Sequence, residues 1–253
     1  MCLILFAWQQ HAEYPLIVIA NRDEYYARPS RDAHWWDDAE IFAGRDLEAG
    51  GTWLGVNRRG RFAAVTNVRE PGSMTPGKRS RGELTREFLA GGADAESYLQ
   101  ALADQDQEYA GFNLLLGDGD GLWFYSNREG RRRRVEAGVY GISNGRFDEP
   151  WPKLKSGREA LTSQLGGDID RSRLLEILTD SRIAGDQELP STGVTLDIER
   201  LLSSRFIRSP DYGTRACSIV TIRRDGQLSF SEQNFIDANT RGATVQESFT
   251  VKQ

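Results

Sequence analysis

The sequence contains few cysteines and few histidines. It has two cysteines, Cys2 and Cys217, among 253 residues. So few cysteines exclude a fold held together by disulfides and are typical of a reducing compartment. It also has two histidines, His11 and His34, so a catalytic triad with an imidazole must use one of them. Neither histidine lies in a recognisable motif, and the spacing of zinc ligands is missing, so we expect no metal site.

The chain also lacks long apolar runs. No stretch approaches the roughly 18 residues that would span a bilayer as a helix, and the first residues lack the basic segment and cleavage site of a signal peptide. The formal net charge of −5 does not favour nucleic acid or an anionic membrane as a partner. We therefore expect a cytoplasmic protein without an integral membrane segment, whose partner is a small-molecule substrate or ligand.

The residues that are present predict an α+β fold. Apolar runs at residues 2–8 and 15–20, joined by a polar turn, predict a hairpin whose strands are buried on both faces. Ser80 and Glu83 form a capping-box pattern that predicts a helix to about Ala90. The predicted order along the chain is strands, two helices, strands, two helices and strands, and no linker separates the halves. We therefore expect one domain over residues 1–253, with helices packed on antiparallel sheets.

Four polar segments lie where predicted strands begin or end. Residues 21–24 follow the strand at 15–20, residues 66–67 end a strand at 61–67, and residues 143–144 end a strand at 135–143. Residues 212–215 lead into a strand predicted at 217–223. Asn and Asp often occupy turns for local reasons, so each segment alone is a weak signal. Together, at the ends of apolar strands, they predict a site presented by a rigid scaffold.

Cysteine at position 2 adds a nucleophile to these polar groups. Aminopeptidases generally remove an initiator Met before a small residue, which would leave Cys2 with a thiol and a free α-amine. An α-amine has a pKa of roughly 7.7–8.0, so it can act near neutral pH as the base that a thiol needs. Acyl chemistry is then possible without histidine. The alternative is a small apolar residue that opens a buried strand, because cysteine is among the most buried residue types.

Six short blocks occur in an order that is typical of one family. They are Met1-Cys2-Leu3-Ile4, Asn21-Arg22-Asp23-Glu24, Gly51-Thr52-Trp53-Leu54-Gly55, Thr66-Asn67-Val68-Arg69, Gly141-Ile142-Ser143-Asn144 and Tyr212-Gly213-Thr214-Arg215. In these blocks the chain resembles the NRDE family, also called the transport and Golgi organisation protein 2 family. That family is in turn similar to N-terminal-nucleophile hydrolases of the choloylglycine and penicillin V acylase type. The resemblance implies a four-layer αββα sandwich.

The resemblance also implies roles for individual residues. Cys2 would attack an amide or thioester carbonyl, and Asp23 would hold the α-amine. Arg22 would set a local field that favours the thiolate, and the asparagines would be donors near the nucleophile and its oxyanion. The implied catalytic residues are Cys2, Asp23, Asn67 and Asn144, and the implied substrate-binding residues are Arg22, Asn21, Trp53 and Arg215.

The order of Arg22 and Asp23 leaves one question open. In the acylases the equivalent residues are separated in sequence, whereas here they are adjacent. Adjacent side chains on a regular strand point to opposite faces. Both can face Cys2 only if the strand has ended or bulged at this point. If it has not, Asn21 and Asp23 share one face, and Arg22 and Glu24 share the other.

The sequence thus predicts an N-terminal-cysteine amidohydrolase or acyltransferase that acts on a small acyl amide or thioester. The alternative is a non-catalytic protein that binds or traffics haem or lipid and reuses the same pocket. The resemblance implies this too, because members of the family are linked to haem trafficking and Golgi organisation. Haem would need an axial ligand, for which the candidates are Cys2, His11, His34 and Met74. Under the hydrolase hypothesis we expect no cofactor.

Overall fold

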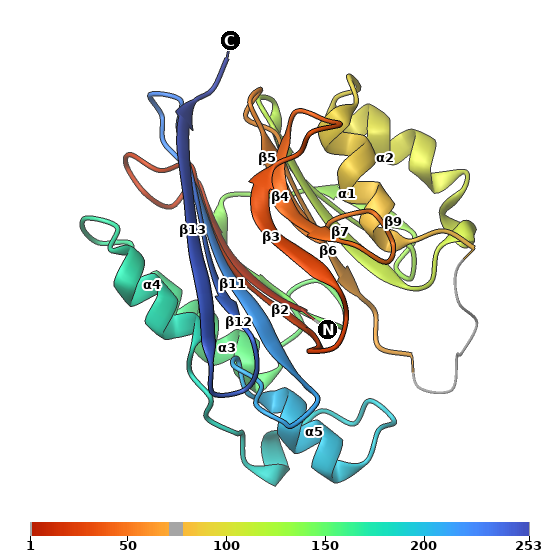
Figure 1. Cartoon of the computed structure of the whole chain (residues 1–253), viewed down its shortest axis with the longest axis vertical. Coiled ribbons are helices and arrows are strands. Elements are labelled where there is room, and N and C mark those ends of the chain that lie inside the picture. The colour runs from red at the N-terminus through yellow and green to blue at the C-terminus, as the bar shows by residue number, and fades with distance from the viewer. Residues whose placement is uncertain (1, 71–77, 253) are drawn as a thin grey trace.

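The chain folds into four layers, which Figure 1 shows edge-on. The computed structural model describes residues 2–70 and 78–252. Two antiparallel sheets face each other, and helices cover the outer face of each. This αββα sandwich confirms the fold class that the resemblance to N-terminal-nucleophile hydrolases implies. Met1, whose removal the sequence predicts, and Met74, a candidate haem ligand, lie outside the described residues.

The first sheet contains six strands in the order β10-β1-β2-β11-β12-β13. Strands β1 and β2 form the predicted hairpin, and both lie inside the sheet rather than at its edge. The six strands are β1 (Cys2–Trp8), β2 (Leu16–Tyr25), β10 (Gly138–Ile142), β11 (Tyr212–Ile222), β12 (Gln227–Phe235) and β13 (Arg241–Thr250). Cys2 is therefore the first residue of an interior strand.

The second sheet contains seven strands, paired in sequence order from β3 to β9. They are β3 (Ser30–Trp35), β4 (Ile41–Asp46), β5 (Leu54–Asn57), β6 (Phe62–Asn67), β7 (Phe112–Asp118), β8 (Gly121–Ser126) and β9 (Arg131–Arg134). The sequence does not predict β3 or β9, because both are polar strands at the edges of the sheet. Three of the four arginines of β9 are exposed.

The described residues form five α-helices around the sheets. Helices α1 (Arg81–Ala90) and α2 (Ala95–Ala103) cover the seven-stranded sheet, while α3 (Pro152–Thr162) and α4 (Arg171–Leu178) cover the six-stranded sheet. Helix α5 (Leu196–Ser203) lies beyond one end of the six-stranded sheet (Figure 1). The predicted capping box of α1 is confirmed, since Ser80 and Glu83 cap each other's backbone groups. Within the described ranges, the helices are all too short or too polar to cross a membrane.

Three apolar cores separate the four layers, and β1 contributes to two of them. Ile4 and Phe6 belong to the core between the sheets. Leu3 and Leu5 belong to the core beneath α3 and α4. Alternate residues of a strand point to opposite faces, so a strand covered on both sides must be apolar throughout. This explains the continuous apolar run that opens the sequence.

Two predicted strand boundaries are wrong in a way that matters for the site. The strand predicted to end at Ala20 continues to Tyr25, and the strand predicted to begin at Cys217 begins at Tyr212. The two segments pair with each other, with Tyr212 opposite Tyr25. The backbone hydrogen bonds of each segment are made with the other, which lies almost 190 residues away in the sequence. Local sequence does not reveal this pairing. The polar residues 21–24 therefore lie inside a paired strand and not after it.

Two glycines allow residues 51–53 to pack against the start of α1. A Cβ atom on Gly51 would lie 2.4 Å from the backbone carbonyl carbon of Gly82. The Thr52 N–H donates to the Gly82 carbonyl at 3.2 Å, and the Thr85 hydroxyl donates to the Thr52 carbonyl. This contact fixes the first turn of α1 beside the space between the sheets.

We expect Gly51→Ala to lower the free energy of unfolding by about 1–3 kcal/mol, because backbone atoms must move to admit the methyl group. Urea denaturation measures this change. Gly166→Ala is the matched control, since a Cβ atom at Gly166 meets nothing within 4 Å and both changes stiffen the unfolded chain alike. Equal stability of the two variants would contradict the close packing at Gly51.

Candidate active site

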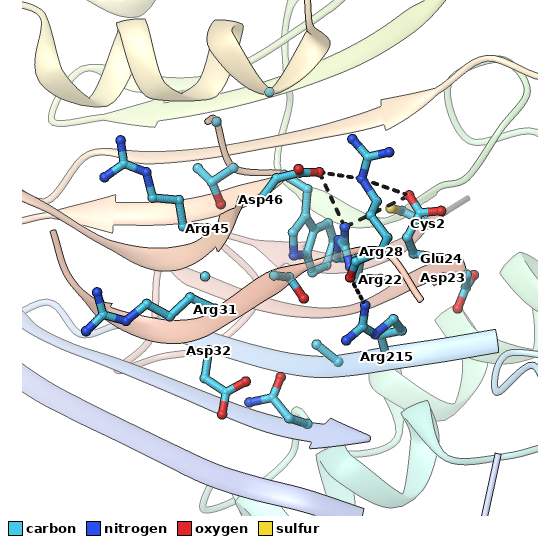
Figure 2. Close-up of a pocket in the computed structure, with 18 of the residues that line it drawn as sticks. Cys2, Arg22, Asp23, Glu24, Arg28, Arg31, Asp32, Arg45, Asp46 and Arg215 are labelled. Carbon is cyan, nitrogen blue, oxygen red and sulfur yellow. Dashed lines mark hydrogen bonds and ion pairs between the residues drawn. The ribbon is translucent and has the colours of Figure 1, made fainter. Parts of the chain in front are cut away.

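The Cys2 side chain lies at one end of the space between the two sheets. It shares its strand face with Ile4 and Phe6, which belong to the inter-sheet core. The residue is 8% exposed and lines a cavity of about 640 Å³. Figure 2 shows the thiol at one end of this cavity, with charged side chains from both sheets along its length.

The pairing of β1 with β2 settles which residue of the Arg22–Asp23 pair faces Cys2. Cys2 lies directly opposite Arg22, in a register that is continuous from Leu16 to Arg22. Directly opposed residues of neighbouring strands point to the same face. The Arg22 side chain therefore lies on the face of the thiol, whereas Asp23 and Asn21 point to the helical layer. The second of the two alternatives is the one observed.

A bulge nevertheless exists nearby, in β11. The register between β2 and β11 shifts between Thr214 and Ala216, so Arg215 is the extra residue. Bulges redirect side chains and are common next to active sites. Here Thr214 points to the helical layer beside Asp23, while Arg215 lines the cavity.

Asp23 is buried on the helical side of β2. The Thr214 hydroxyl donates to Asp23 Oδ1 at 2.7 Å. Burial raises the pKa of the carboxyl group, and the positive charges of Lys153 and Arg22 oppose that rise. The backbone N–H of Asp23 donates to the Cys2 sulfur, so the residue contacts the nucleophile through its main chain.

Lys153 is a buried charge that the sequence does not reveal. It lies in the first turn of α3 and is only 4% exposed, although lysines are seldom buried without a partner. Its Nζ atom has no hydrogen-bond partner among the described residues. Burial lowers the pKa of Lys153 to about 8, and the Asp23 carboxylate opposes this change. Lys153 and Asp23 therefore stabilise each other's charged forms.

The Cys2 thiol is not activated in advance. Burial raises its pKa, and the nearby Asp23 carboxylate raises it too. Arg22 and the Asp23 N–H lower the pKa, but by less than burial raises it. Arg22 thus lowers the thiol pKa, as predicted, but the net shift is upwards and the thiol stays protonated near neutral pH. Such a thiol needs a base at the moment of attack.

Asn67 ends a strand of one sheet, Asn144 follows a strand of the other, and the two residues are joined by a hydrogen bond. Asn67 is the last residue of β6 and lines the cavity. Asn144 follows β10, is buried, and donates from Nδ2 to the Asn67 backbone carbonyl at 2.8 Å. The Arg69 N–H in turn donates to the Asn144 carbonyl at 2.7 Å. Asn144 therefore supports the backbone that presents Asn67 to the cavity.

Further polar side chains tie the same strand ends to Cys2. The Ser143 hydroxyl donates to the Cys2 carbonyl at 3.0 Å, and the Thr66 hydroxyl donates to the Ser143 carbonyl at 2.5 Å. Asn113, for which the sequence gives no signal, donates to the Gly145 carbonyl at 2.8 Å. We refer to Thr66, Asn113, Ser143 and Asn144 as the inter-sheet polar network. All four side chains are buried.

The residues predicted to bind substrate fall into two groups. Arg22, Trp53 and Arg215 line the cavity. Asn21 is instead fully buried on the helical side, where its Nδ2 donates to the carbonyls of Leu178 at 2.9 Å and Arg205 at 2.8 Å. Asn21 therefore connects β2 to the end of α4, and the structure does not bring it to the cavity.

Of the four candidate haem ligands, Cys2 lines the cavity. His11 Nε2 lies 3.0 Å from the Gly167 carbonyl, and His34 Nδ1 lies 2.8 Å from the Asp32 carbonyl. Neither histidine is among the cavity-lining residues of the described ranges.

Comparison with known proteins gives matches along the whole chain. A sequence profile described as Transport and Golgi organisation 2 matches residues 1–237. The Bos taurus protein named transport and Golgi organization protein 2 homolog is 34% identical, covering 100% of both chains. Its Homo sapiens counterpart is 34% identical over 94% of both chains. Among solved structures, a mutant of the conjugated bile acid hydrolase from Clostridium perfringens is similar with a TM-score of 0.48 and 11% identity, over 100% of this chain and 97% of that chain.

The depressed pKa of Lys153 predicts a pH-dependent stability. Because the folded-state pKa of about 8 lies below the ordinary value of 10.5, the unfolded chain binds more protons between these values, and this lysine adds stability as the pH rises. Between about pH 7.5 and 9.5, the unfolding free energy of wild type should gain roughly 2 kcal/mol relative to Lys153→Met.

Urea denaturation across this pH range measures the difference. Tyrosines and cysteines also contribute to the pH dependence of stability, but wild type and variants share these residues, so their contributions cancel in the comparison. Lys155→Met is the matched control, because Lys155 is exposed on the same helix, and its curve should stay parallel to wild type. A Lys153→Met curve that is also parallel would disprove the depressed pKa.

Proposed function

This chain belongs to the Transport and Golgi organisation 2 family, and we propose that it is an N-terminal-cysteine amidohydrolase or acyltransferase acting on a small acyl amide or thioester. The observation that carries the proposal is the position of Cys2. The residue opens an interior strand, and its thiol lines a cavity of about 640 Å³ that also contains Arg22 and Asn67. A volume of this size suits a small-molecule substrate.

The α-amine of Cys2 is the proposed base. Removal of Met1 would expose this amine on the same residue as the thiol, within reach of a proton transfer. Its ordinary pKa of roughly 7.7–8.0 suits proton transfer near neutral pH. The raised pKa of the Cys2 thiol makes such a base necessary. Asp23, whose main chain contacts the sulfur, would hold the ammonium form of the amine by its charge.

Acylation begins when the thiol attacks the substrate carbonyl. A C–S bond forms while the thiol proton passes to the α-amine. The carbonyl oxygen becomes an oxyanion, for which the Asn67 side-chain amide is the proposed donor. The C–N or C–S bond to the leaving group then breaks, and the ammonium returns its proton to that group. The product is a thioester on Cys2.

Deacylation reverses the roles of the same groups. The α-amine removes a proton from water, or from an acceptor in the transferase reaction, as the oxygen or nitrogen attacks the thioester. The new bond to the acyl carbon forms, the C–S bond breaks, and the proton returns to the sulfur. Asn144, through its hydrogen bond to the Asn67 carbonyl, would keep the oxyanion donor in place through both steps.

The proposal predicts that the purified protein lacks Met1 and that Cys2→Ala abolishes turnover of acyl amides and thioesters. Intact mass spectrometry and a substrate panel measure these two outcomes. Insertion of one glycine between Met1 and Cys2 provides a sharper variant, because it leaves the thiol but removes the α-amine from it, and it should be equally inactive. Unchanged turnover in either variant, or a retained Met1, would overturn the proposed mechanism.

The two asparagines should differ in what they contribute. Asn67→Ala should lower kcat by about 10²–10³-fold, as expected for the loss of an oxyanion donor, with little change in stability. Asn144→Ala should lower the free energy of unfolding by about 1–3 kcal/mol, since it leaves the half-buried Asn67 carbonyl without its donor. Steady-state kinetics and urea denaturation of both variants distinguish the roles. A normal kcat in Asn67→Ala would exclude it as the oxyanion donor.

A further inference from the structure

The cavity beside Cys2 is cationic, although the protein as a whole is acidic. Its described lining contains seven arginines against five carboxylate residues, one of which is Asp23, whose carboxylate points to the helical layer. The whole chain has a net charge of −5. A cleft of one sign concentrates ligands of the opposite sign. The arginines come from both sheets and from the start of α1: Arg22, Arg28, Arg31, Arg45, Arg79, Arg81 and Arg215.

Three of these arginines are neutralised by close carboxylates. Such pairs hold loops and strand ends in place but leave little charge for a ligand. The pairs are Arg28 with Asp46 at 2.7 Å, Arg45 with Asp38 at 2.8 Å and Arg79 with Glu83 at 3.0 Å.

Arg81 and Arg215 have no carboxylate partner among the described residues. Arg81 Nη1 donates to the Gly111 carbonyl at 3.2 Å, and Arg215 Nη1 donates to the Tyr25 carbonyl at 3.3 Å. Carbonyl groups orient a guanidinium but do not cancel its charge. Arg215 Nε is buried and lacks a hydrogen-bond partner within the described part of the chain. Both guanidinium groups stay charged, because arginine does not lose its proton in proteins.

Arg22 is only partly compensated. Its Nη2 atom lies 3.7 Å from Asp46 and 3.9 Å from Glu24, and Asp46 is already bound more closely by Arg28. Figure 2 places Arg22 between the Cys2 end of the cavity and Arg215. Arg31 lies towards the opposite end of the cavity in the same view.

Two special features of the fold bring these charges to the cavity. The β11 bulge adds Arg215 as an extra residue between Thr214 and Ala216. The close contact of Gly51 with Gly82 fixes Arg81 at the start of α1. An electrostatic contribution of Cys2 to the pKa of Arg81 is consistent with a position near the thiol.

We infer that the cavity binds ligands that carry an anionic group, a carboxylate or a phosphate, held by Arg22, Arg81 and Arg215 beside the Cys2 thiol. A guanidinium matches both groups, because its fork of N–H donors binds two oxygens at once. In naming a substrate class, the inference rests on the proposed function: the substrate is an acyl amide or thioester that also carries an acid group.

Alkylation of Cys2 tests the local charge without requiring turnover. Iodoacetate and iodoacetamide react by the same displacement, in which the C–S bond forms and iodide leaves, but only iodoacetate is anionic. The ratio of their rate constants at Cys2, followed by peptide mass, should exceed the ratio for N-acetylcysteinamide by on the order of tenfold. Arg81→Gln and Arg215→Gln should each lower the ratio towards that of the free thiol.

Arg131→Gln is the control for these variants. It removes the same charge from the exposed edge strand β9 and should leave the ratio unchanged. Circular dichroism verifies that each variant is folded. A wild-type ratio equal to that of the free thiol would overturn the inference, and so would an equal drop in Arg131→Gln.

Calorimetry on Cys2→Ala provides a second measurement that does not depend on thiol reactivity. Glutarate or inorganic phosphate should bind at least about tenfold more tightly than neutral glutaramide, and the comparison of the two anions identifies the preferred acid group. If neither anion binds more tightly than glutaramide, the inference is wrong. Anion binding by a protein that hydrolyses nothing would contradict the proposed function alone. Hydrolysis of neutral amides without anion binding would contradict this inference alone.

Discussion

The hydrogen bond from the Ser143 hydroxyl to the Cys2 carbonyl holds the start of the chain in the site. The β1–β10 ladder begins only at Ile4, opposite Ile142, so on that side Ser143 continues the pairing where the backbone ladder stops. Thr66 reaches Ser143 from the other sheet, and the same network supports the Asn67 backbone through Asn144. Buried polar groups are costly unless they are paired. The inter-sheet polar network therefore fixes the nucleophile and the proposed oxyanion donor relative to each other, although they belong to different sheets.

The sequence predicts the layers of this fold better than the faces of its strands. A strand buried on both sides must be apolar throughout, so the run of β1 identifies an interior strand, and the Ser80 capping box marks the start of α1 because both signals are local. The extent of β2 depends on its pairing with β11, which is distant in sequence. Local sequence therefore predicts the polar residues of β2 beyond the end of the strand. Because alternate residues of a strand point to the same face, the sequence places Asn21 and Asp23 on one face of β2. Only the pairing of Cys2 with Arg22 shows which of the two faces lines the cavity. Lys153 gives no signal, since a lysine in the first turn of a helix is normally exposed.

The buried charges around Cys2 are arranged in two layers, separated by β2. Arginines lie on the cavity side, whereas Asp23 and Lys153 lie on the helical side. Burying a charged lysine costs free energy, which is why burial lowers the pKa of Lys153 to about 8. Without Lys153 the Asp23 carboxyl group, whose pKa burial already raises, would lose a positive charge that favours its ionised form. In the proposed mechanism Asp23 must stay ionised to hold the ammonium form of the α-amine. The free-energy cost of burying Lys153 therefore helps to keep the negative charge on Asp23 that this mechanism requires.

The order of Arg22 and Asp23 follows from the same two layers. Adjacent residues of a regular strand point to opposite faces, so one dipeptide delivers a cation to the thiol side and an anion to the lysine side. Exchanging the two residues would place a carboxylate beside Cys2, where it would raise the thiol pKa further and repel an anionic ligand. It would also place a guanidinium beside Lys153, where like charges repel strongly because little water screens them. The sequence order is therefore tied to the strand register: with Cys2 opposite Arg22, only this order gives both faces of β2 the charge that they need.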